Sequence, residues 1–552
     1  MERKKLLILI VILGMGFVLR FIKLSQFPVS MRMDEVAIGY NAYSLLKTGK
    51  DEWGFNFPLI FRSIGDYKPP ILVYLTVPTI AIFGLNEFAV RAPAALAGSL
   101  TVLAVFFLVR RLTNDNISLV TSLLLAVSPW HIKFSRSSYE AILALLFVIL
   151  GVYFFLKGVS KLSGKVYFYL SFFFLALSMY TYHSERVFIP FLVFGLIILY
   201  RKELIKNKIT FIKSALWGIL ILLPLIFLLF RPEGQLRAKN TFFIGDLELQ
   251  KILYKSTDYE VNPYALMRSN TYVTLKFWLK RYLGYFDSDF IFIDAMNMTR
   301  EGAADIGILY LVEPPFFILG AFLAAFTSYN LLGKIKKLVF LWLFLGPLAA
   351  SLANNAYHPL RALTIIPIYQ LFTAYGFVFF FSKIRNHLFK KIYLGLSLSF
   401  LFFNVLYFLE LYFIHYPNAH SEYDMDGWKK AALFGLKEAQ KYEQVVVDPT
   451  FGTQGPYTVG TPYLYFLFYG QIDPKEYLED SRRKELPWST NFRNFTFRAI
   501  DWRETPEKDT DKYKKNILFI GSEWVLPAHE NQIIKRFYLY NGKEILRAVE
   551  VK

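Results

Sequence analysis

The chain has 552 residues, of which 55% are hydrophobic, 18% aromatic and only 19% charged. One soluble core cannot bury this much apolar surface, so the composition excludes an ordinary soluble protein and predicts a membrane protein. The net charge is +19, but the basic residues cluster between apolar segments, which indicates membrane topology and anionic lipid rather than a nucleic acid partner. The absence of cysteine excludes disulfides, thiolate metal sites and a cysteine nucleophile.

Apolar segments recur up to about residue 413 and predict an α-helical polytopic membrane domain of residues 1–413 with about eleven transmembrane helices. The segments are 6–19, 88–109, 117–130, 140–156, 166–180, 187–200, 214–230, 306–326, 338–352, 360–381 and 392–413. The first follows Met-Glu-Arg-Lys-Lys and is not followed by a small-residue cleavage pattern. We therefore expect an uncleaved helix with its basic end in the cytoplasm.

The short connections indicate the orientation. With a cytoplasmic N-terminus, every short cytoplasmic loop is basic; these loops hold Arg110–Arg111, Lys157–Lys165, Arg201–Lys208, Lys334–Lys337 and Lys383–Lys391. The positive-inside rule then places the long loops 22–87 and 231–305 outside, in a multi-pass protein of the plasma membrane. The apolar run Pro69–Leu85 begins with two prolines and contains Pro78, so we expect it to lie at the interface. Counting this run as a span would invert the predicted orientation of every later segment.

The composition changes after Phe413. Residues 414–552 are more polar and contain short β-like runs at Gln444–Val447, Asn516–Gly521 and Glu544–Val551. A stretch of about 140 residues has the size of an ordinary domain. We therefore expect a soluble α/β domain on the extracytoplasmic side of the membrane.

Acidic residues beside apolar segments are the first candidates for chemistry, because charge at membrane depth is usually functional or paired. Asp34 and Glu35 follow the first apolar segment, where a carboxylate suits a general base that meets a lipid-borne substrate. The alternative is a helix N-cap at Asp34 with Glu35 in the first turn. Glu140 begins another apolar segment, and its alternative role is an acid favoured by the helix dipole.

Cationic residues outside the apolar segments are candidates for binding a phosphate. Lys68 precedes Pro69, which favours an extended backbone; its ammonium could neutralise a lipid phosphate or simply snorkel. Arg361, in His358-Pro-Leu-Arg361, could hold a phosphate bidentately or anchor a helix.

Three further residues have open alternatives. Arg91 could simply pair with Glu87 at the start of the second span. His183 and Arg186 lie in a short outer loop, where a lone histidine is more often structural than a ligand.

Taken in order, these motifs resemble the C-type glycosyltransferase superfamily, in particular the protein O-mannosyltransferase and aminoarabinose transferase group. The resemblance covers about residues 5–415 and is carried by Asp34-Glu35, Asp66-Tyr67-Lys68-Pro69-Pro70, Glu87-Phe-Ala-Val-Arg91, Phe134-Ser-Arg136 with Glu140, Tyr180-Thr-Tyr182-His183-Ser-Glu-Arg186 and His358-Pro-Leu-Arg361. Eukaryotic protein mannosyltransferases carry His-Pro-Pro where this chain has Lys68-Pro69-Pro70, and an inserted β-trefoil domain that we do not find. The chain therefore fits a bacterial or archaeal member.

The resemblance implies a C-type glycosyltransferase fold, a donor sugar linked through phosphate to a polyprenol or dolichol, and transfer with inversion. The acceptor hydroxyl could belong to a protein, a lipid or a cell-envelope glycan. Asp34 would be the general base, Lys68 would face the donor phosphate and Arg361 would contact it as well. Glu140 matches a second acidic position, and Glu35 would support the loop or the acceptor. The other expected substrate-binding residues are Asp66, Tyr67, Arg91, His183, Arg186 and His358.

No Walker loop, dinucleotide fingerprint or His-Glu-x-x-His motif occurs, so we expect no nucleotide cofactor. Acidic residues near a phosphate could bind Mg²⁺, but we predict no metal. The alternative from another class is a transporter or flippase for polyprenyl-linked lipid or glycan, which predicts charges in mid-span and often repeated halves. The charges here lie at outer segment ends, with Glu313 a partial exception, and no repeat is evident. We therefore favour the enzyme.

Overall fold

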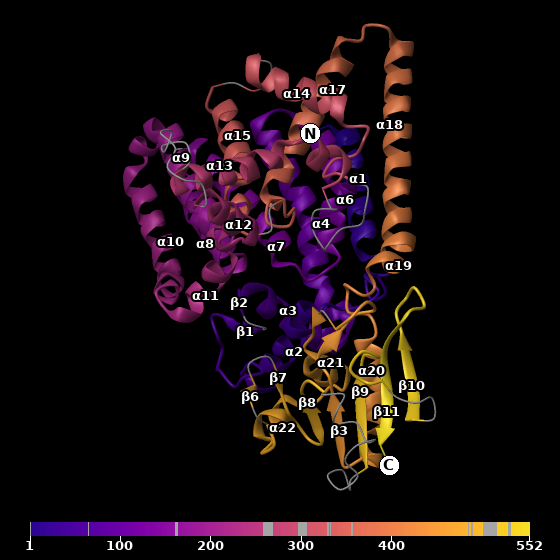
Figure 1. Ribbon diagram of the computed structural model, residues 1–552. Helices are drawn as coiled ribbons and strands as arrows, with labels where there is room; N and C mark the ends of the chain where they lie inside the picture. The colour runs from indigo at the N-terminus through magenta and orange to yellow at the C-terminus, as the bar shows by residue number, and fades with distance from the viewer. Residues whose placement is uncertain are drawn as a thin grey trace. The chain divides into compact units, whose positions relative to one another are not determined.

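The computed structural model describes residues 2–551 except 64–65, 161–163, 258–268, 296–305, 328–330, 332, 355–356, 457, 484, 487–488, 501–515 and 528–531. Part of the predicted loop 231–305 thus lies outside the described residues. The chain divides into two compact units, labelled by element in Figure 1. Unit 1 consists of residues 1–22, 94–135 and 139–410, and unit 2 of residues 23–93, 136–138 and 411–552.

Unit 1 is helical, and each predicted apolar segment corresponds to a helix. The long helices are α1 (Arg3–Phe21), α4 (Glu87–Leu112, which begins in unit 2), α5 (Asp115–Val127), α7 (Glu140–Ser160), α8 (Lys165–Thr181), α9 (Glu185–Lys206), α10 (Lys208–Leu229), α14 (Pro314–Phe326), α15 (Gly333–Leu345), α17 (Ile366–Lys383) and α18 (His387–Glu410). Shorter elements are α6 (Pro129–Ser135), α11 (Pro232–Thr241), η1 (Phe243–Gly245), α12 (Leu247–Thr257), α13 (Asn270–Leu283), η3 (Gly284–Phe286), η4 (Asp289–Ile293), α16 (Leu348–Ser351) and η5 (Leu363–Ile365).

Five helical segments among the described residues are long and apolar enough to cross a membrane, and the pair α5 and α6, bent by 56°, would make a sixth. The five are Glu87–Leu112, Glu140–Ser160, Lys208–Leu229, Leu363–Lys383 and His387–His420. The chain is therefore a helical multi-pass membrane protein, as its composition predicts. The total of about eleven spans stays a prediction.

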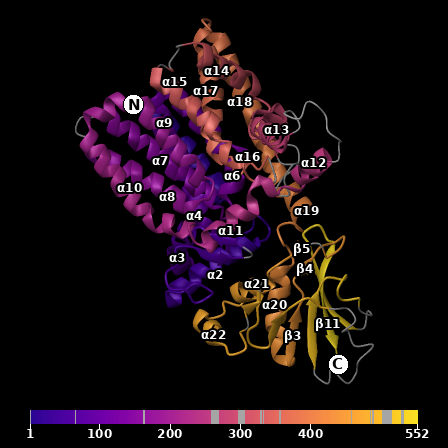
Figure 2. The same ribbon diagram turned by 60° about the vertical axis from the view of Figure 1, so that its left-hand side comes forward.

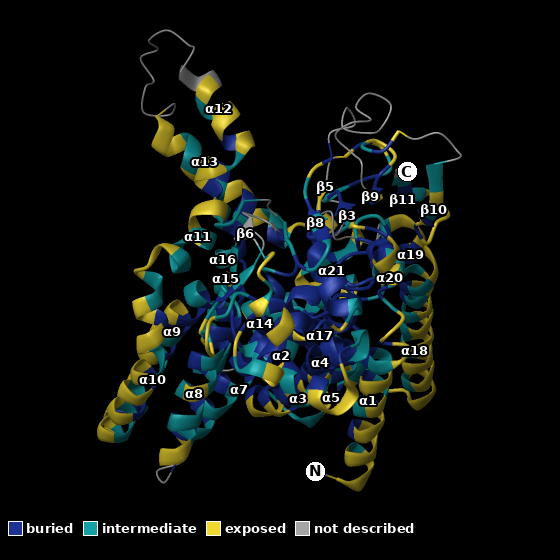
Figure 3. Cartoon of the chain, turned by 90° about the horizontal axis from the view of Figure 1, so that it is seen from below, coloured by how far each residue is buried: buried dark blue, intermediate teal, exposed yellow. Residues whose placement is uncertain are grey.

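The exposed helices support this conclusion. Only 17% of the apolar stretch of α10 and 6% of that beginning with α18 is buried inside the protein, against 72% for α4 and α7. Figure 3 shows α10 and α18 largely in the colour of exposed residues. Water would solvate such surfaces unfavourably, whereas acyl chains match them. These two helices thus present apolar faces suited to lipid.

Unit 2 contains a five-stranded sheet with strand order β10-β11-β9-β3-β8. Its strands are β3 (Gln444–Val447), β8 (Phe495–Phe497), β9 (Ile517–Gly521), β10 (Ile533–Tyr538) and β11 (Glu544–Val551). β3 pairs in parallel with β8 and β9, whereas β11 pairs antiparallel with β9 and β10. The three β-like runs predicted after Phe413 correspond to β3, β9 and β11.

Both faces of this sheet are covered. Val445 and Val447 of β3 belong to one hydrophobic cluster and Val446 to another, as the alternation of side chains along a strand requires. Helices α20 (Trp428–Glu438) and α21 (Pro462–Tyr469) lie on one face (Figure 2). All of β9 is buried, which is typical of a central strand with both faces covered.

The larger cluster of unit 2 joins the first long loop to the C-terminal region. Val36, Ile38 and Tyr40 of α2 (Met33–Thr48) share it with Tyr463–Phe468 of α21. The remaining elements of unit 2 are β1 (Phe61–Ser63), β2 (Asp66–Lys68), α3 (Ile71–Phe83), η6 (Leu411–His415), α19 (Tyr416–His420), η7 (Ala439–Lys441), β4 (Thr450–Phe451), β5 (Thr458–Val459), α22 (Pro474–Glu479), β6 (Glu485–Leu486) and β7 (Ser489–Thr490).

Helix α3 is the apolar run that we expected at the interface. It has 13 residues and contains Pro78. At ~1.5 Å per residue it is roughly 20 Å long, less than the ~30 Å of a bilayer core. Its length therefore agrees with an interfacial position.

Candidate active site

The start of α2 carries the first predicted acid. Arg32 is the N-cap, and its backbone N–H donates to Glu35 Oε2 at 3.2 Å. Glu35 thus closes a capping box, and the N-cap role considered for Asp34 is not observed. Asp34 lies in the first helical turn with 60% of its side chain exposed. A carboxylate at this position is favoured by the helix dipole and remains accessible to substrate.

Lys68 lies beside this carboxylate. It ends β2, which pairs antiparallel with β1 so that Phe61 is opposite Lys68, and the extended strand suits a residue that precedes proline. Lys68 Nζ is 2.9 Å from Asp34 Oδ1, and the Lys68 side chain is 13% exposed. The structure therefore brings together a proton acceptor and a cation from separate parts of the first loop.

The neighbours of Lys68 on β2 differ in the side they face. Asp66 Oδ1 accepts a hydrogen bond from the backbone N–H of Tyr67 at 2.8 Å. Because side chains alternate along a strand, Asp66 faces the same side as Lys68 and Tyr67 the opposite side. Of the two, Asp66 is the better placed to act together with Lys68.

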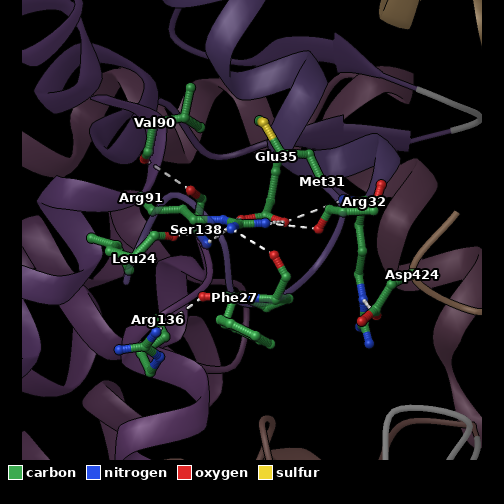
Figure 4. A network of polar contacts seen from close by, with 12 residues as sticks. Leu24, Phe27, Met31, Arg32, Glu35, Val90, Arg91, Arg136, Ser138 and Asp424 are labelled. Carbon is green, nitrogen blue, oxygen red and sulfur yellow. Dashed lines mark hydrogen bonds and ion pairs between the residues drawn. The ribbon is translucent and has the colours of Figure 1, made fainter. Parts of the chain in front are cut away.

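Glu35, the neighbour of Asp34 in the sequence, forms a buried ion pair with Arg91 (Figure 4). Arg91 is fully buried and Glu35 is 4% exposed. The guanidinium donates Nε–H to Glu35 Oε1 at 3.0 Å and Nη2–H to Oε2 at 3.4 Å. Its other three bonds go to the backbone oxygens of Leu24, Pro28 and Ser30, at 3.1, 2.9 and 2.7 Å.

These contacts use all five N–H groups of an arginine. We therefore infer that Arg91 positions the loop before α2 instead of binding substrate. Glu35 also accepts a bond from the backbone N–H of Ser138 at 3.2 Å, so its carboxylate is fully engaged inside unit 2. Of the two roles expected for Glu35, support of the loop is the one that fits. The alternative pairing of Arg91 with Glu87 is not observed, because Glu87 pairs with Lys429 at 2.5 Å.

Several residues that hold the same loop were not singled out from the sequence. Arg32 donates to Asp424 Oδ1 at 2.8 Å and to Tyr416 Oη at 3.0 Å. The buried Arg136 donates to the Phe27 carbonyl at 3.2 Å. Arg136 lies in the Phe134-Ser-Arg136 motif, and Asp424 lies in the polar region after Phe413. No sequence signal linked either to the first loop, because both contacts bridge more than a hundred residues.

The remaining predicted residues belong to unit 1. Glu140 is the first residue of α7 and half-buried, the position in which the helix dipole favours an acid. His183 lies between α8 and α9, and Arg186 Nε–H donates to the Met179 carbonyl at 3.2 Å. That contact ties Arg186 to the end of α8, which is a helix-anchoring arrangement.

His358 and Arg361 lie in the turn before η5. The backbone N–H of His358 donates to the hydroxyl of the buried Tyr285 at 3.1 Å. Arg361 Nη1–H donates to the Asn354 carbonyl at 2.5 Å, a contact that ties the guanidinium to the preceding loop. Lys68 belongs to unit 2 and Arg361 to unit 1. That the two residues bind the same phosphate therefore stays a prediction.

Within the described part of the chain, no group of three or more His, Asp or Glu side chains is arranged to hold a metal ion. That the protein needs no metal stays a prediction.

The sequence is similar to a protein family and to two further proteins. Residues 67–227 match the family described as dolichyl-phosphate-mannose-protein mannosyltransferase. An uncharacterized protein of Aquifex aeolicus (strain VF5) is 26% identical over 419 residues, which cover 70% of this chain and 79% of that protein. The putative mannosyltransferase YkcB of Bacillus subtilis (strain 168) is 27% identical over 152 residues, which cover 27% of this chain and 21% of YkcB.

The fold is similar to that of solved membrane glycosyltransferases. ArnT from Cupriavidus metallidurans, solved with undecaprenyl phosphate, has a TM-score of 0.54 at 11% identity, covering 98% of this chain and 97% of ArnT. The Archaeoglobus fulgidus oligosaccharyltransferase, tethered with an acceptor peptide, has a TM-score of 0.50 at 13% identity, covering 86% of this chain and 63% of that one. At these identities the likeness concerns the fold. Together with the family match it confirms the resemblance to C-type glycosyltransferases, and the chain is a membrane glycosyltransferase.

Proposed function

We propose that this glycosyltransferase moves a sugar from a polyprenyl-phosphate donor to an acceptor hydroxyl on the extracytoplasmic face, with inversion at the anomeric carbon. The observation that carries the proposal is the pair formed by Asp34 Oδ1 and Lys68 Nζ, 2.9 Å apart, at the start of α2. Two comparisons support a lipid-linked donor: the matched family is named for dolichyl-phosphate-mannose, and the similarly folded ArnT was solved with undecaprenyl phosphate.

The chemistry needs both members of the pair. A hydroxyl is a weak nucleophile, so Asp34 would take its proton as the oxygen attacks the anomeric carbon. The leaving phosphate gains charge during the attack, and the Lys68 ammonium would stabilise that charge. An ammonium has three N–H donors, so Lys68 can bind phosphate and carboxylate together. Attack from the face opposite the phosphate inverts the anomeric carbon.

The resemblance further implies that Arg361 contacts the donor phosphate, that Glu140 is a second acidic catalytic residue, and that His183, Arg186 and His358 bind substrate. These roles stay proposals. The N-terminus would be cytoplasmic, and the sheet of unit 2 would belong to an extracytoplasmic domain. The acceptor would be a protein, lipid or envelope glycan that presents a hydroxyl.

The proposal is tested by incubating the purified protein in liposomes with radiolabelled polyprenyl-phosphate sugars and candidate acceptors. We expect Asp34→Asn to lower the transfer rate at least about a hundredfold, the usual contribution of a general base, with donor binding retained. Lys68→Ala should raise the donor KM about tenfold to a hundredfold, because it removes a charge-assisted contact. Lys50→Ala is the matched control, since Lys50 is an exposed lysine of the same loop.

Three results would contradict the proposal. Wild-type turnover by Asp34→Asn would remove Asp34 from the mechanism. Wild-type donor kinetics in Lys68→Ala would exclude that lysine from the phosphate site. Label that changes leaflet without reaching any acceptor would identify a flippase.

A further inference from the structure

The C-terminal part of unit 2 contacts the segment that carries Asp34. We propose that this region sets the position of the Asp34 carboxylate, with Tyr465 and Asp424 as positioning residues. The inference rests on the proposed function, since it gives Asp34 the role of general base. In this view the C-terminal region takes part in catalysis indirectly, by holding the loop that carries Asp34. A domain that only bound the acceptor would not need to contact this loop.

The first contact is made by Tyr465 of α21. Its hydroxyl donates to the Met31 carbonyl at 2.8 Å, and both residues are fully buried. Met31 lies just before the N-cap of α2, so this bond fixes the backbone from which the helix begins. A buried carbonyl that loses its donor has no water to replace it, so this bond holds the loop against Tyr465.

The second contact is made by Asp424. Its Oδ1 accepts from Arg32 Nε–H at 2.8 Å and from the Tyr416 hydroxyl at 3.2 Å. The Asp424 side chain is 1% exposed, and the Arg32 guanidinium lies 4.8 Å from the centre of the Tyr423 ring. The residue that caps α2 is therefore held by charge, hydrogen bonds and stacking, all from the region after residue 411.

The body of α2 is held by the same region. The Tyr40 hydroxyl donates to the Ile472 carbonyl at 3.1 Å. One residue further on, Asn41 Nδ2 donates to Glu52 Oε1 at 2.9 Å, and the Tyr463 hydroxyl donates to Oε2 of that glutamate at 3.2 Å. These contacts oppose both rotation and sliding of α2, which sets the direction of the Asp34 side chain.

The functional consequence follows from the geometry of proton transfer. A general base must lie within hydrogen-bond reach of its proton, and a displacement of about 1 Å can lower a rate a hundredfold. Asp34 itself is 60% exposed, and its carboxylate is carried by the first turn of α2. Its position therefore depends on the buried contacts beneath it.

The test is the variant Tyr465→Phe, which keeps the ring and removes the hydroxyl. We expect kcat to fall about tenfold or more, with the donor KM unchanged within about twofold, because the base moves while the donor contacts remain. The matched control is Tyr442→Phe, since the hydroxyl of Tyr442 interacts with Glu550 of the same unit and not with the first loop. A double variant with Asp34→Asn should be no slower than Asp34→Asn alone, because a residue that acts through Asp34 has nothing left to position.

The outcomes separate this inference from the proposed function. If Asp34→Asn is inactive but both Tyr465→Phe and Asp424→Asn keep the wild-type kcat, the positioning role is overturned and the proposed function stands. The positioning role would also be overturned if Tyr465→Phe lowered the kcat of Asp34→Asn by the same factor as it lowers that of the wild type. Tyr465 would then act independently of Asp34. An active Asp34→Asn would overturn the proposed function first. Asp424→Asn decides the question if Tyr465→Phe does not fold.

Discussion

The buried side chain of Glu52 makes the stability of unit 2 depend on pH. Its carboxyl is 1% exposed, and burial raises its pKa from the ordinary value of 4.5 to about 8, although hydrogen bonds from Asn41 and Tyr463 act in the opposite direction. Loss of hydration therefore outweighs the two hydrogen bonds. At neutral pH the folded protein holds a proton here that the unfolded chain releases.

The sign of the pH effect follows. Between the two pKa values the unfolded state binds fewer protons than the folded state, so the contribution of Glu52 to stability is complete below about pH 4.5 and falls as the pH rises to about 8. We expect Glu52→Gln, which keeps the shape and stays neutral, to become more stable relative to wild type as the pH rises. The measurement is the Tm of both proteins at about pH 5 and about pH 8; an equal Tm difference at both pH values would contradict it.

Helix α2 carries Asp34, and it packs tightly against α21 and the start of α4. A Cβ atom built on Gly39 would lie 2.6 Å from Phe468 Cε2 and 2.7 Å from Val90 Cγ2. Glycine is needed here because a side chain would push the helices apart, not because of its backbone conformation.

We therefore expect Gly39→Ala to destabilise the protein by about 1–3 kcal/mol through overpacking, although alanine favours a helix over glycine by about 1 kcal/mol. Gly14→Ala in α1 is the matched control, since no atom lies within 4 Å of a Cβ atom there. That variant should keep or slightly raise the Tm. Thermal unfolding of both variants checks the prediction, and a change of the same sign and size in both would contradict it.

At the scale of the whole molecule, unit 2 is assembled from segments distant in sequence. Residues 23–93 and 411–552 share one hydrophobic cluster and the polar contacts of Arg32, Glu52 and Met31. A core shared in this way should open as one cooperative unit.

Hydrogen exchange tests this cooperativity. In denaturant we expect the amides of α2 to lose protection together with those of β3 and β9, and Tyr465→Phe to lower the protection of all three elements in parallel. Loss of protection in α2 while the sheet stays protected would show that the first loop opens independently.

Much of the fold could be predicted because its signals are local. The apolar segments correspond to helices, and Gln444–Val447 and Glu544–Val551 are strands, since period and hydrophobicity reflect the environment of each segment. The pairing of Asp34 with Lys68 could also be anticipated, because both residues lie in one loop of a recognisable motif series. Contacts between residues distant in sequence could not be anticipated. Arg91 pairs with Glu35 instead of Glu87, and nothing near either residue indicates this.

The sequence by itself determined that this is a multi-pass membrane protein of glycosyltransferase type, and it predicted the loop that carries Asp34 and Lys68, because hydropathy and short motifs are properties of contiguous residues. Only the tertiary structure decided that Glu35 and Arg91 are buried supports and that Tyr465 and Asp424 hold the loop of Asp34. The physical reason is that a buried polar group must find a partner wherever the folded chain supplies one, and that place is set by packing rather than by distance along the sequence.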